Sequence, residues 1–402
     1  MRDIHDYPGR YSLMRAAVEK SHLDKASKSL VLEFDALLAA KRFSLPRRIK
    51  YLEILRLVGV AIGKPLNKVS RDDLMRFFGD LDARPLSAWT KNTYAVLVKR
   101  FWKWLKGLEG MKDYPPEVSW IPGTIPRSQV PLLRPEVLPD EKDVVAMLRA
   151  TKHPRDRAFI SVLWETGARI GELGNLLVRD VVFDDVGGML NVVGKTGARR
   201  VRILQSVPDV SNWLSIHPLR EQADAPLWVT MSNNSRGKPI AYPAMRKFLR
   251  EAAARAEVKK RVNPHAFRHA RASHLANHLT EFQMNHYLGW VQGSGMPGTY
   301  VHLSGKDTDN ALLKLNGLKP KDEDNRQSEL KPRVCVRCTT LNQPDGRFCR
   351  KCGGGLELAA TLRAESERRE SEELMALVLK DADVQKVVQE ALLKLKLKQP
   401  LT

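Results

Sequence analysis

The sequence contains little cysteine and no long apolar stretch. Only four of its 402 residues are cysteines, and all four lie between positions 335 and 352, which excludes a disulfide framework spread through a secreted fold. No apolar run reaches the roughly 18 residues that a membrane-spanning helix needs. The first ten residues, MRDIHDYPGR, lack the apolar region of a signal peptide. We therefore expect a cytoplasmic protein that does not contact a membrane.

Acidic residues are outnumbered by basic ones, with 46 Asp and Glu against 67 Lys and Arg and a net charge of +21. The excess is ten charges in residues 1–138, eight in residues 139–318 and three in residues 319–402. This distribution favours a polyanion that lies along an extended surface over a basic tail that only tethers. A ribosomal or membrane-surface protein would share the charge alone. Because 43% of the residues are hydrophobic, wholesale disorder is excluded.

The first third of the chain has apolar residues at helical spacing and predicts a helical domain. Its last helix, in TKNTYAVLVKRFWKWLKGL (residues 90–108), mixes aromatic and basic residues. Two interpretations stay open: a core face beside a solvated face, or a helix that faces duplex DNA. Seven prolines between positions 115 and 139 then predict a semi-extended linker. The predicted organisation is a helical DNA-binding domain (1–111), a Pro-rich linker (112–138), a second domain (139–318), a flexible linker (319–334), a cysteine module (335–356) and a C-terminal helix (357–402).

Within the second domain, three segments place polar residues where helix cores or turns are expected, and a hairpin signal surrounds Lys195. The three are TGARIGEL with Arg169 and Glu172, HAFRHARASH with His265 and Arg268, and YLGWVQGSGMPGTYVHLSG with Trp290 and Tyr300.

These residue types suggest one reaction. Two arginines can hold the non-bridging oxygens of a phosphodiester and stabilise a five-coordinate transition state. A histidine can donate a hydrogen bond or move a proton, and a tyrosine can attack phosphorus covalently. A lysine can protonate the leaving oxygen. The sequence has no carboxylate cluster suited to catalytic magnesium, which argues against a two-metal nuclease.

The segments resemble those of the tyrosine recombinases, also called phage-integrase-type site-specific recombinases. The family pattern is an Arg in TGxRxxEL, a Lys in a GK hairpin, HxxRH, LGH or LGW, and a Tyr before xH, and all five occur here in that order. The loop before the tyrosine is one residue longer than in the commonest bacterial members, and LGW…GTYVHLSG is similar to archaeal relatives. The resemblance implies a mainly α fold with a small antiparallel β-sheet (α+β), in which a SAM-like helical core-binding domain precedes the catalytic domain.

The resemblance also implies roles for the phosphate-binding residues. Arg169 and Arg268 look like the phosphate-binding pair, and His265 looks like the phosphate-contacting histidine and proton handler. Glu172 matches the acidic position that supports the first arginine, although a purely structural role is an equal alternative.

The remaining roles follow in the same way. Lys195 resembles the general acid for the 5′ oxygen, with a solvated turn lysine as the alternative. Tyr300 resembles the nucleophile, and Tyr287 is the alternative. Trp290 stands where the family more often has His but accepts Trp.

By this resemblance the protein would be a site-specific recombinase or integrase that cleaves and rejoins DNA through a 3′-phosphotyrosyl intermediate. It would bind double-stranded DNA as a synaptic tetramer at the nucleoid, without ATP or Mg²⁺. Two alternatives remain open, a type IB-like topoisomerase and a catalytically idle DNA-binding regulator with the same fold.

The cysteines form two CxxC pairs separated by ten residues. Four thiolates in this arrangement suit a structural Zn²⁺ in a zinc-ribbon-like module, and redox pairs are the alternative. The module would contact DNA or a partner protein. The four predicted ligands are Cys335, Cys338, Cys349 and Cys352.

Two further features lie outside the pattern. His269, His274 and His278 are expected on one helix, and the last two have a metal-like spacing, but core or hydrogen-bonding roles are favoured because no acid or cysteine lies close in sequence. A charged helix over residues 362–398 carries an apolar stripe, which would pack against its own chain or a neighbouring protomer.

Overall fold

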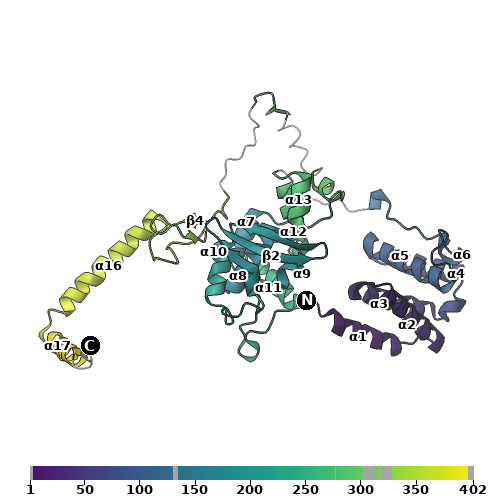
Figure 1. The fold of residues 1–402 in the computed structure, drawn as a ribbon, viewed down its shortest axis with the longest axis horizontal. Helices are drawn as coiled ribbons and strands as arrows, with labels where there is room; N and C mark the ends of the chain where they lie inside the picture. The colour runs from purple at the N-terminus through teal and green to yellow at the C-terminus, as the bar shows by residue number, and fades with distance from the viewer. Residues whose placement is uncertain are drawn as a thin grey trace. The chain divides into compact units, whose positions relative to one another are not determined.

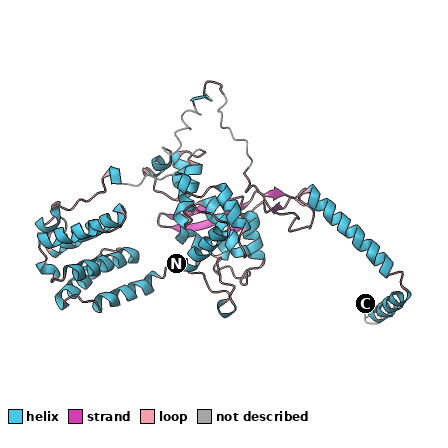
Figure 2. Cartoon of the chain, turned by 180° about the vertical axis from the view of Figure 1, so that it is seen from behind, coloured by secondary structure: helices cyan, strands magenta, loops and turns pink. Residues whose placement is uncertain are grey.

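The computed structural model describes residues 3–129, 135–276, 278–301, 312–313, 315–318 and 328–396. The chain divides into two compact units, Met1–Arg134 and Pro135–Thr402. The fold is mainly helical with small antiparallel sheets (Figures 1 and 2), which confirms the predicted fold class. Among the helices described, none is both long and apolar enough to cross a membrane.

The first unit is helical around one hydrophobic core. The aromatic side of α5 belongs to this core, since Phe101 and Trp102 are fully buried and Lys99 reaches inward to donate a hydrogen bond to the Ile121 carbonyl at 2.6 Å. The core-face interpretation of this helix is therefore correct for its aromatic side. The helices are α1 (Tyr7–Glu19), α2 (Lys25–Ala40), α3 (Leu45–Ile62), α4 (Arg71–Ala83), α5 (Ala88–Leu105) and the short α6 (Pro116–Ser119).

The second unit is built around α8 (Pro154–Thr166), which is buried along most of its length and packs against α7, α10, α12 and β3. An Asp140 capping box begins α7, and Gly167, in the left-handed conformation, ends α8. The other helices are α7 (Glu141–Arg149), α9 (Ile170–Gly174), α10 (Val207–Ser215), α11 (Tyr242–Arg255), α12 (Pro264–Leu275), α13 (Glu281–Leu288) and α14 (Met296–Val301).

A three-stranded antiparallel sheet lies in this unit, in the order β1 (Val181–Phe183), β2 (Gly188–Gly194) and β3 (Gly197–Ile203). Gly194 pairs with Gly197, so Lys195 and Thr196 form a two-residue hairpin turn at the predicted position. The strand after this turn brings its side chains beside α9 and α13. Strand β3 therefore links the Lys195 hairpin turn to α9 and to the C-terminal part of α13.

The C-terminal part contains β4 (Arg333–Val334), β5 (Leu341–Asn342), α16 (Leu358–Val378) and α17 (Ala382–Lys396). The prediction of one continuous last helix is wrong. Asp381 interrupts it, because its Oδ1 accepts hydrogen bonds from the backbone N–H groups of Asp383 and Val384 and so caps a new helix. Most of the predicted flexible linker, residues 319–327, lies outside the described residues, as do residues 397–402.

The cysteine module contacts the rest of its unit through a buried arginine. Arg157 of α8 donates from Nε to Asp209 Oδ1 at 2.8 Å and from a terminal nitrogen to Asp345 Oδ1 at 2.7 Å. Gln343 donates to the same Asp209 oxygen at 2.6 Å. Gln343 and Asp345 stand in the spacer between the two cysteine pairs, so this spacer is a contact surface toward α8 and α10.

Candidate active site and metal centre

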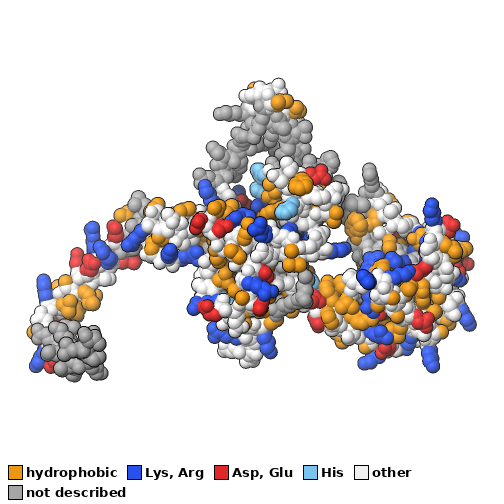
Figure 3. Space-filling view, viewed as in Figure 1, with side chains coloured by type: hydrophobic (Ala, Val, Ile, Leu, Met, Phe, Trp, Pro, Cys, Tyr) orange, Lys and Arg blue, Asp and Glu red, His pale blue; other side chains and the backbone are white. Residues whose placement is uncertain are grey.

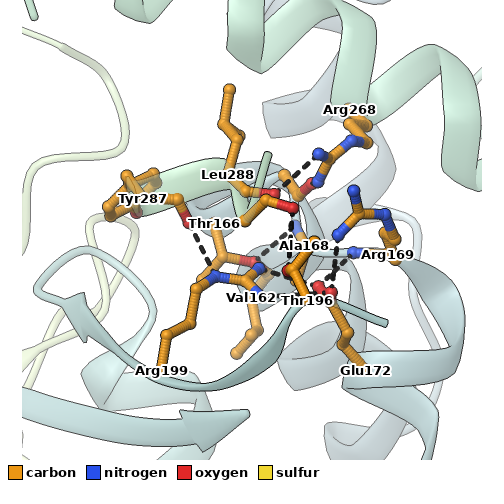
Figure 4. Close-up of polar contacts among 12 residues, drawn as sticks. Val162, Thr166, Ala168, Arg169, Glu172, Thr196, Arg199, Arg268, Tyr287 and Leu288 are labelled. Atoms are coloured by element: carbon orange, nitrogen blue, oxygen red, sulfur yellow. Dashed lines mark hydrogen bonds and ion pairs between the residues drawn. The ribbon is translucent and has the colours of Figure 1, made fainter. Parts of the chain in front are cut away.

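The carboxylate of Glu172 is the centre of a buried ion cluster (Figure 4). Its side chain is 2% exposed. Arg169 contacts it twice, from its backbone N–H at 3.0 Å and from a guanidinium nitrogen at 2.9 Å. Arg199 of β3 adds a bidentate pair at 3.0 and 2.7 Å. Glu172 therefore orients Arg169, whose side chain remains one-third exposed at 33%.

Arg199 also connects the cluster to α13, because its Nε donates to the Tyr287 carbonyl at 3.0 Å. Burial raises the pKa of Glu172, but the hydrogen bonds and charges of Arg199 and Arg169 outweigh burial, so the net pKa is lowered and the carboxylate stays ionised. Two arginines around one carboxylate leave the cluster with a net positive charge. That charge suits an anionic ligand.

Arg268 lies on α12 and is held by two carbonyl groups. Its terminal nitrogens donate to Gly167 at 2.9 Å and to Leu288 at 2.7 Å, which are the ends of α8 and α13. Burial and, after it, the nearby charge of Arg169 together lower its pKa to about 10. The guanidinium also lies over the Trp290 ring, 5.3 Å from its centroid.

Trp290, Tyr300 and His269 form a layered aromatic cluster next to Arg268. The Trp290 and Tyr300 rings stack at 5.5 Å with an interplanar angle of 11°. The Tyr300 hydroxyl lies 2.7 Å from His269 Nδ1, and the tyrosine is 1% exposed. Burial raises the pKa of Tyr300, and the positive charge of Arg268 opposes this rise.

The other two predicted residues are exposed. His265 begins α12, and its pKa is lowered by partial burial and by the charges of Arg268, Arg261 and Arg169. Lys195 occupies the hairpin turn, and in the part of the chain that the structure describes its ammonium group makes no hydrogen bond or ion pair. Its neighbour Thr196 donates to the Gly289 carbonyl at 3.1 Å, so the hairpin tip is attached to the segment that carries Trp290.

Two glycines border the ion cluster at close range. A Cβ on Gly194 would meet Glu172 Oε1 at 2.2 Å, and a Cβ on Gly289 would meet the Arg199 guanidinium at 2.5 Å. Gly289 also has a φ of 64°, which side chains rarely adopt. Both positions need glycine for the cluster to close.

The alternative nucleophile Tyr287 and the alternative metal pair, His274 and His278, are both among the described residues. Tyr287 donates its hydroxyl to the Glu165 carbonyl at 3.2 Å, and burial raises its pKa to about 12. The His274 and His278 rings lie 5.1 Å apart, but within the described ranges the cysteine cluster is the single group of three or more side chains placed to hold a metal ion.

The four cysteine Sγ atoms lie within 4.8 Å of one another. The Cys335–Cys352 and Cys338–Cys349 pairs are 3.6 and 3.5 Å apart, and a tetrahedral ion with bonds of about 2.3 Å requires separations near 3.8 Å. Each CxxC turn folds the same way, with a backbone hydrogen bond from the fourth residue after the first cysteine and a positive φ there. The donor set therefore fits one tetrahedral metal ion.

Sequence reasoning missed Arg199, and it favoured a core or hydrogen-bonding role for His269 without naming the partner. Arg199 stands among other arginines in GARRVR, and only the strand register shows that it alone turns inward to Glu172. His269 is the last letter of the HxxRH motif, which could have singled it out, but its partner lies 31 residues away.

The second unit of this chain matches a known protein family in sequence. The phage integrase family matches residues 139–306. Tyrosine recombinase XerD of Ralstonia nicotianae is 28% identical over 259 residues, covering 60% of this chain and 78% of the relative. Tyrosine recombinase XerA of Pyrococcus furiosus is 26% identical over 249 residues, covering 61% and 80%.

Solved structures share the fold. The XerH site-specific recombinase in a post-cleavage complex with palindromic difH substrate has a TM-score of 0.54 at 16% identity, covering 77% of this chain and 95% of that one. A lambda integrase dimer bound to a COC′ core site has a TM-score of 0.53 at 14% identity, covering 69% and 77%.

We predict that Arg199→Met destabilises the protein by roughly 3–5 kcal/mol at pH 7, because it leaves a buried carboxylate with one partner. The lowered pKa of Glu172 means that its stabilising effect is present above its ordinary value of 4.5 and is lost as pH falls through the lower folded value. The difference between variant and wild type should therefore shrink below pH 4. Urea unfolding at pH 7 and at pH 3.5 measures both.

The matched control is Arg202→Met on the same strand. Arg202 pairs with Asp184 at a site where both side chains are about two-fifths exposed, at 38% and 42%, so its loss should cost far less stability than the loss of Arg199. Equal losses from the two substitutions would contradict a special role for the buried cluster.

Proposed function

We propose that this chain, whose residues 139–306 match the phage integrase family and which is similar to tyrosine recombinases XerD and XerA, is a site-specific recombinase that cleaves and rejoins duplex DNA through a 3′-phosphotyrosyl intermediate. The observation that carries this proposal is the position of Arg268, which is held by the ends of α8 and α13, lies within electrostatic reach of Arg169, and sits over the Trp290 ring that stacks on Tyr300. Two guanidinium groups and a tyrosine hydroxyl are the groups that attack on a phosphodiester requires.

In the proposed reaction, Arg169 and Arg268 bind the non-bridging oxygens and stabilise the charge of the five-coordinate transition state. Tyr300 Oη attacks phosphorus and the bond to the 5′ oxygen breaks, with Lys195 supplying the proton to that oxygen. His265 donates a further hydrogen bond to the phosphate. The 5′ hydroxyl of a partner strand then displaces the tyrosine, and because the phosphotyrosyl bond conserves the phosphodiester's energy, no nucleotide cofactor is required.

Duplex DNA is the proposed partner of both units. Lys and Arg side chains are spread over the first and the second unit in the view of Figure 3, in keeping with the excess positive charge of both sequence segments. The helical unit would serve as the core-binding domain. We propose that the protein acts on DNA as a homo-oligomer, up to a synaptic tetramer, at the nucleoid in the cytoplasm; solved relatives include a lambda integrase dimer on a core site and a tetramer on a Holliday junction.

We further propose that the cysteine cluster holds Zn²⁺ with a structural role. Four cysteine ligands leave no open position on the ion. When bound, zinc crosslinks the two CxxC turns and so fixes the spacer between them. Gln343 and Asp345 of this spacer contact Asp209 and Arg157, so the metal module would brace the second unit.

The test of the function uses DNA captured by the protein itself. Sequencing the DNA that stays covalently attached to the wild-type protein identifies a target site. A duplex with this sequence and a nick next to the scissile phosphate then traps the phosphotyrosyl adduct. Strand exchange between two such sites separates a recombinase from a topoisomerase, and a wild-type protein that binds DNA but forms no adduct would be an idle regulator.

We predict that Tyr300→Phe abolishes the covalent adduct and leaves DNA binding nearly unchanged. The substitution removes one hydroxyl, whereas affinity comes mostly from phosphate contacts elsewhere. Tyr287→Phe is the control, because its hydroxyl donates to the Glu165 carbonyl and has no assigned part in the reaction, and it should retain adduct formation. An adduct at normal yield in Tyr300→Phe would move the nucleophile elsewhere, first to Tyr287.

We predict that Lys195→Ala slows cleavage by a factor on the order of 10²–10⁴, the usual contribution of a positioned acid. A substrate with sulfur in place of the 5′ bridging oxygen should restore most of the rate, because a thiolate leaves without a proton. Equal defects on both substrates would show that Lys195 is not the acid and would shift suspicion to His265.

We predict about one zinc per chain, with cleavage that proceeds in EDTA. Metal removal, or Cys349→Ser, should lower the thermal midpoint of unfolding, while the folded fraction keeps its cleavage rate. A protein that lacks residues 319–402 should likewise form the Tyr300 adduct. Metal analysis and adduct yield per folded molecule measure this, and a folded, DNA-binding truncation that cannot cleave would show that the C-terminal part helps to build the active site.

A further inference from the structure

The hydroxyl of Tyr300 has one hydrogen-bond partner among the described residues, and that partner is a histidine outside the roles assigned so far. His269 Nδ1 lies 2.7 Å from Tyr300 Oη, with the ring centroids 5.8 Å apart and inclined by 36°. His269 follows Arg268 directly in α12. The residue that touches the attacking atom therefore sits beside a residue proposed to hold the phosphate.

A tyrosine that attacks phosphorus must lose its proton, and this tyrosine is poorly placed to lose it to water. Tyr300 is 1% exposed, and burial raises its pKa above the ordinary value of 10. At neutral pH the hydroxyl is therefore protonated and a weak nucleophile. It needs a base within hydrogen-bond reach.

His269 has the protonation state that a base requires. Its pKa is lowered from the ordinary 6.5 by burial first and then by His265, Arg268 and Arg261. Among the described residues, the groups that face it are therefore these three and Tyr300, and none of the four carries a negative charge at neutral pH. A neutral imidazole keeps one ring nitrogen free of a proton, and Nδ1 facing a hydroxyl donor is the nitrogen that accepts.

The other candidate bases are occupied or out of contact. Both oxygens of Glu172 are bound by Arg169 and Arg199. His265 is exposed at the start of α12, and in the described structure it makes no hydrogen bond to Tyr300. The stacking of Trp290 on Tyr300 fixes the phenol ring, so its hydroxyl stays directed at His269.

Building on the proposed function, we propose that His269 is a catalytic residue, the general base that takes the proton of Tyr300. As Oη attacks phosphorus, the hydroxyl proton moves to His269 Nδ1 and gives an imidazolium, while the bond from phosphorus to the 5′ oxygen breaks and that oxygen receives its proton from Lys195. In the rejoining step the incoming 5′ hydroxyl attacks phosphorus, its proton returns to Lys195, and the departing phenolate takes back the proton from His269. Protons and charges balance over the cycle.

The experiment compares His269 variants of the full chain on the nicked duplex described above. Single-turnover cleavage is measured at saturating protein between pH 5.5 and 9.5. The wild-type rate should be level above the ordinary histidine pKa and fall only at acid pH. His269→Ala should be slower by a factor on the order of 10²–10⁴ at pH 7. Its defect should shrink by about tenfold per pH unit as pH rises toward the pKa of Tyr300, which burial holds above the ordinary tyrosine value.

A second variant separates proton transfer from positioning. His269→Gln keeps a hydrogen-bond acceptor near the hydroxyl but cannot take up a proton. We expect it to be about as slow as His269→Ala at pH 7. A wild-type rate and pH profile in His269→Gln would overturn the proposal and leave His269 as a positioning residue.

A change in the nucleophile itself gives the sharpest readout. Fluorinated tyrosine at position 300 has a much more acidic phenol, which ionises without a base. Combined with His269→Ala, it should restore most of the lost rate at pH 7. If the defect persists unchanged with the fluorinated phenol and at every pH, the proposal is wrong.

Control variants and measurements separate the loss of a general base from misfolding or weaker DNA binding. His274→Ala removes a histidine from the same helix that makes no contact with Tyr300 among the described residues, and it should cleave at the wild-type rate. Urea unfolding and DNA binding show whether each variant is folded. If the wild-type protein forms no adduct at all, the proposed function is wrong. If an adduct forms equally well in the His269 variants, only the assignment of His269 as the general base is wrong.

Discussion

The ion cluster at Glu172 is the interaction on which the candidate site depends. One carboxylate, 2% exposed, connects the turn after α8 through Arg169, the sheet through Arg199 and the end of α13 through the Tyr287 carbonyl. A buried charge that loses one partner is far more costly than an exposed pair. The three elements are therefore held in a single arrangement, and Arg169 remains the member that solvent and substrate can reach.

A second group of side chains, Arg268, Trp290 and Tyr300, packs next to the Glu172 ion cluster. Arg268 spans from the end of α8 to the end of α13, the same two termini that flank the ion cluster. On it lies Trp290, and on Trp290 lies Tyr300. The Trp290 indole thus lies between the Arg268 guanidinium and the Tyr300 phenol. The proposed nucleophile, Tyr300, is therefore close to the proposed phosphate ligand, Arg268, without a direct hydrogen bond between them. The electrostatic benefit of Arg268 to a developing phenolate follows from this proximity.

Part of this arrangement can be predicted from the sequence, because helix ends and hairpin turns depend on residues that are neighbours in the chain. Gly167 ends α8 and the Lys195 turn closes a hairpin, and both are set by short-range backbone chemistry. The inward direction of Arg199 depends on strand register, and the contact of His269 depends on how the segment after Trp290 folds back. The spacer contacts of Gln343 and Asp345 with α8 and α10 join residues more than 130 positions apart. Such pairings are fixed by tertiary packing, which no local pattern reports.

The two glycines beside the ion cluster have a consequence for which residues these positions can hold. Gly194 faces the Glu172 carboxylate and Gly289 faces the Arg199 guanidinium, each closer than a methyl group allows. Neither residue takes part in the chemistry, yet even alanine at either position would push apart the charges that hold Arg169. Any residue larger than glycine at either position requires the carboxylate or the guanidinium that it meets to shift, so these two backbone positions are coupled to the charges that hold Arg169.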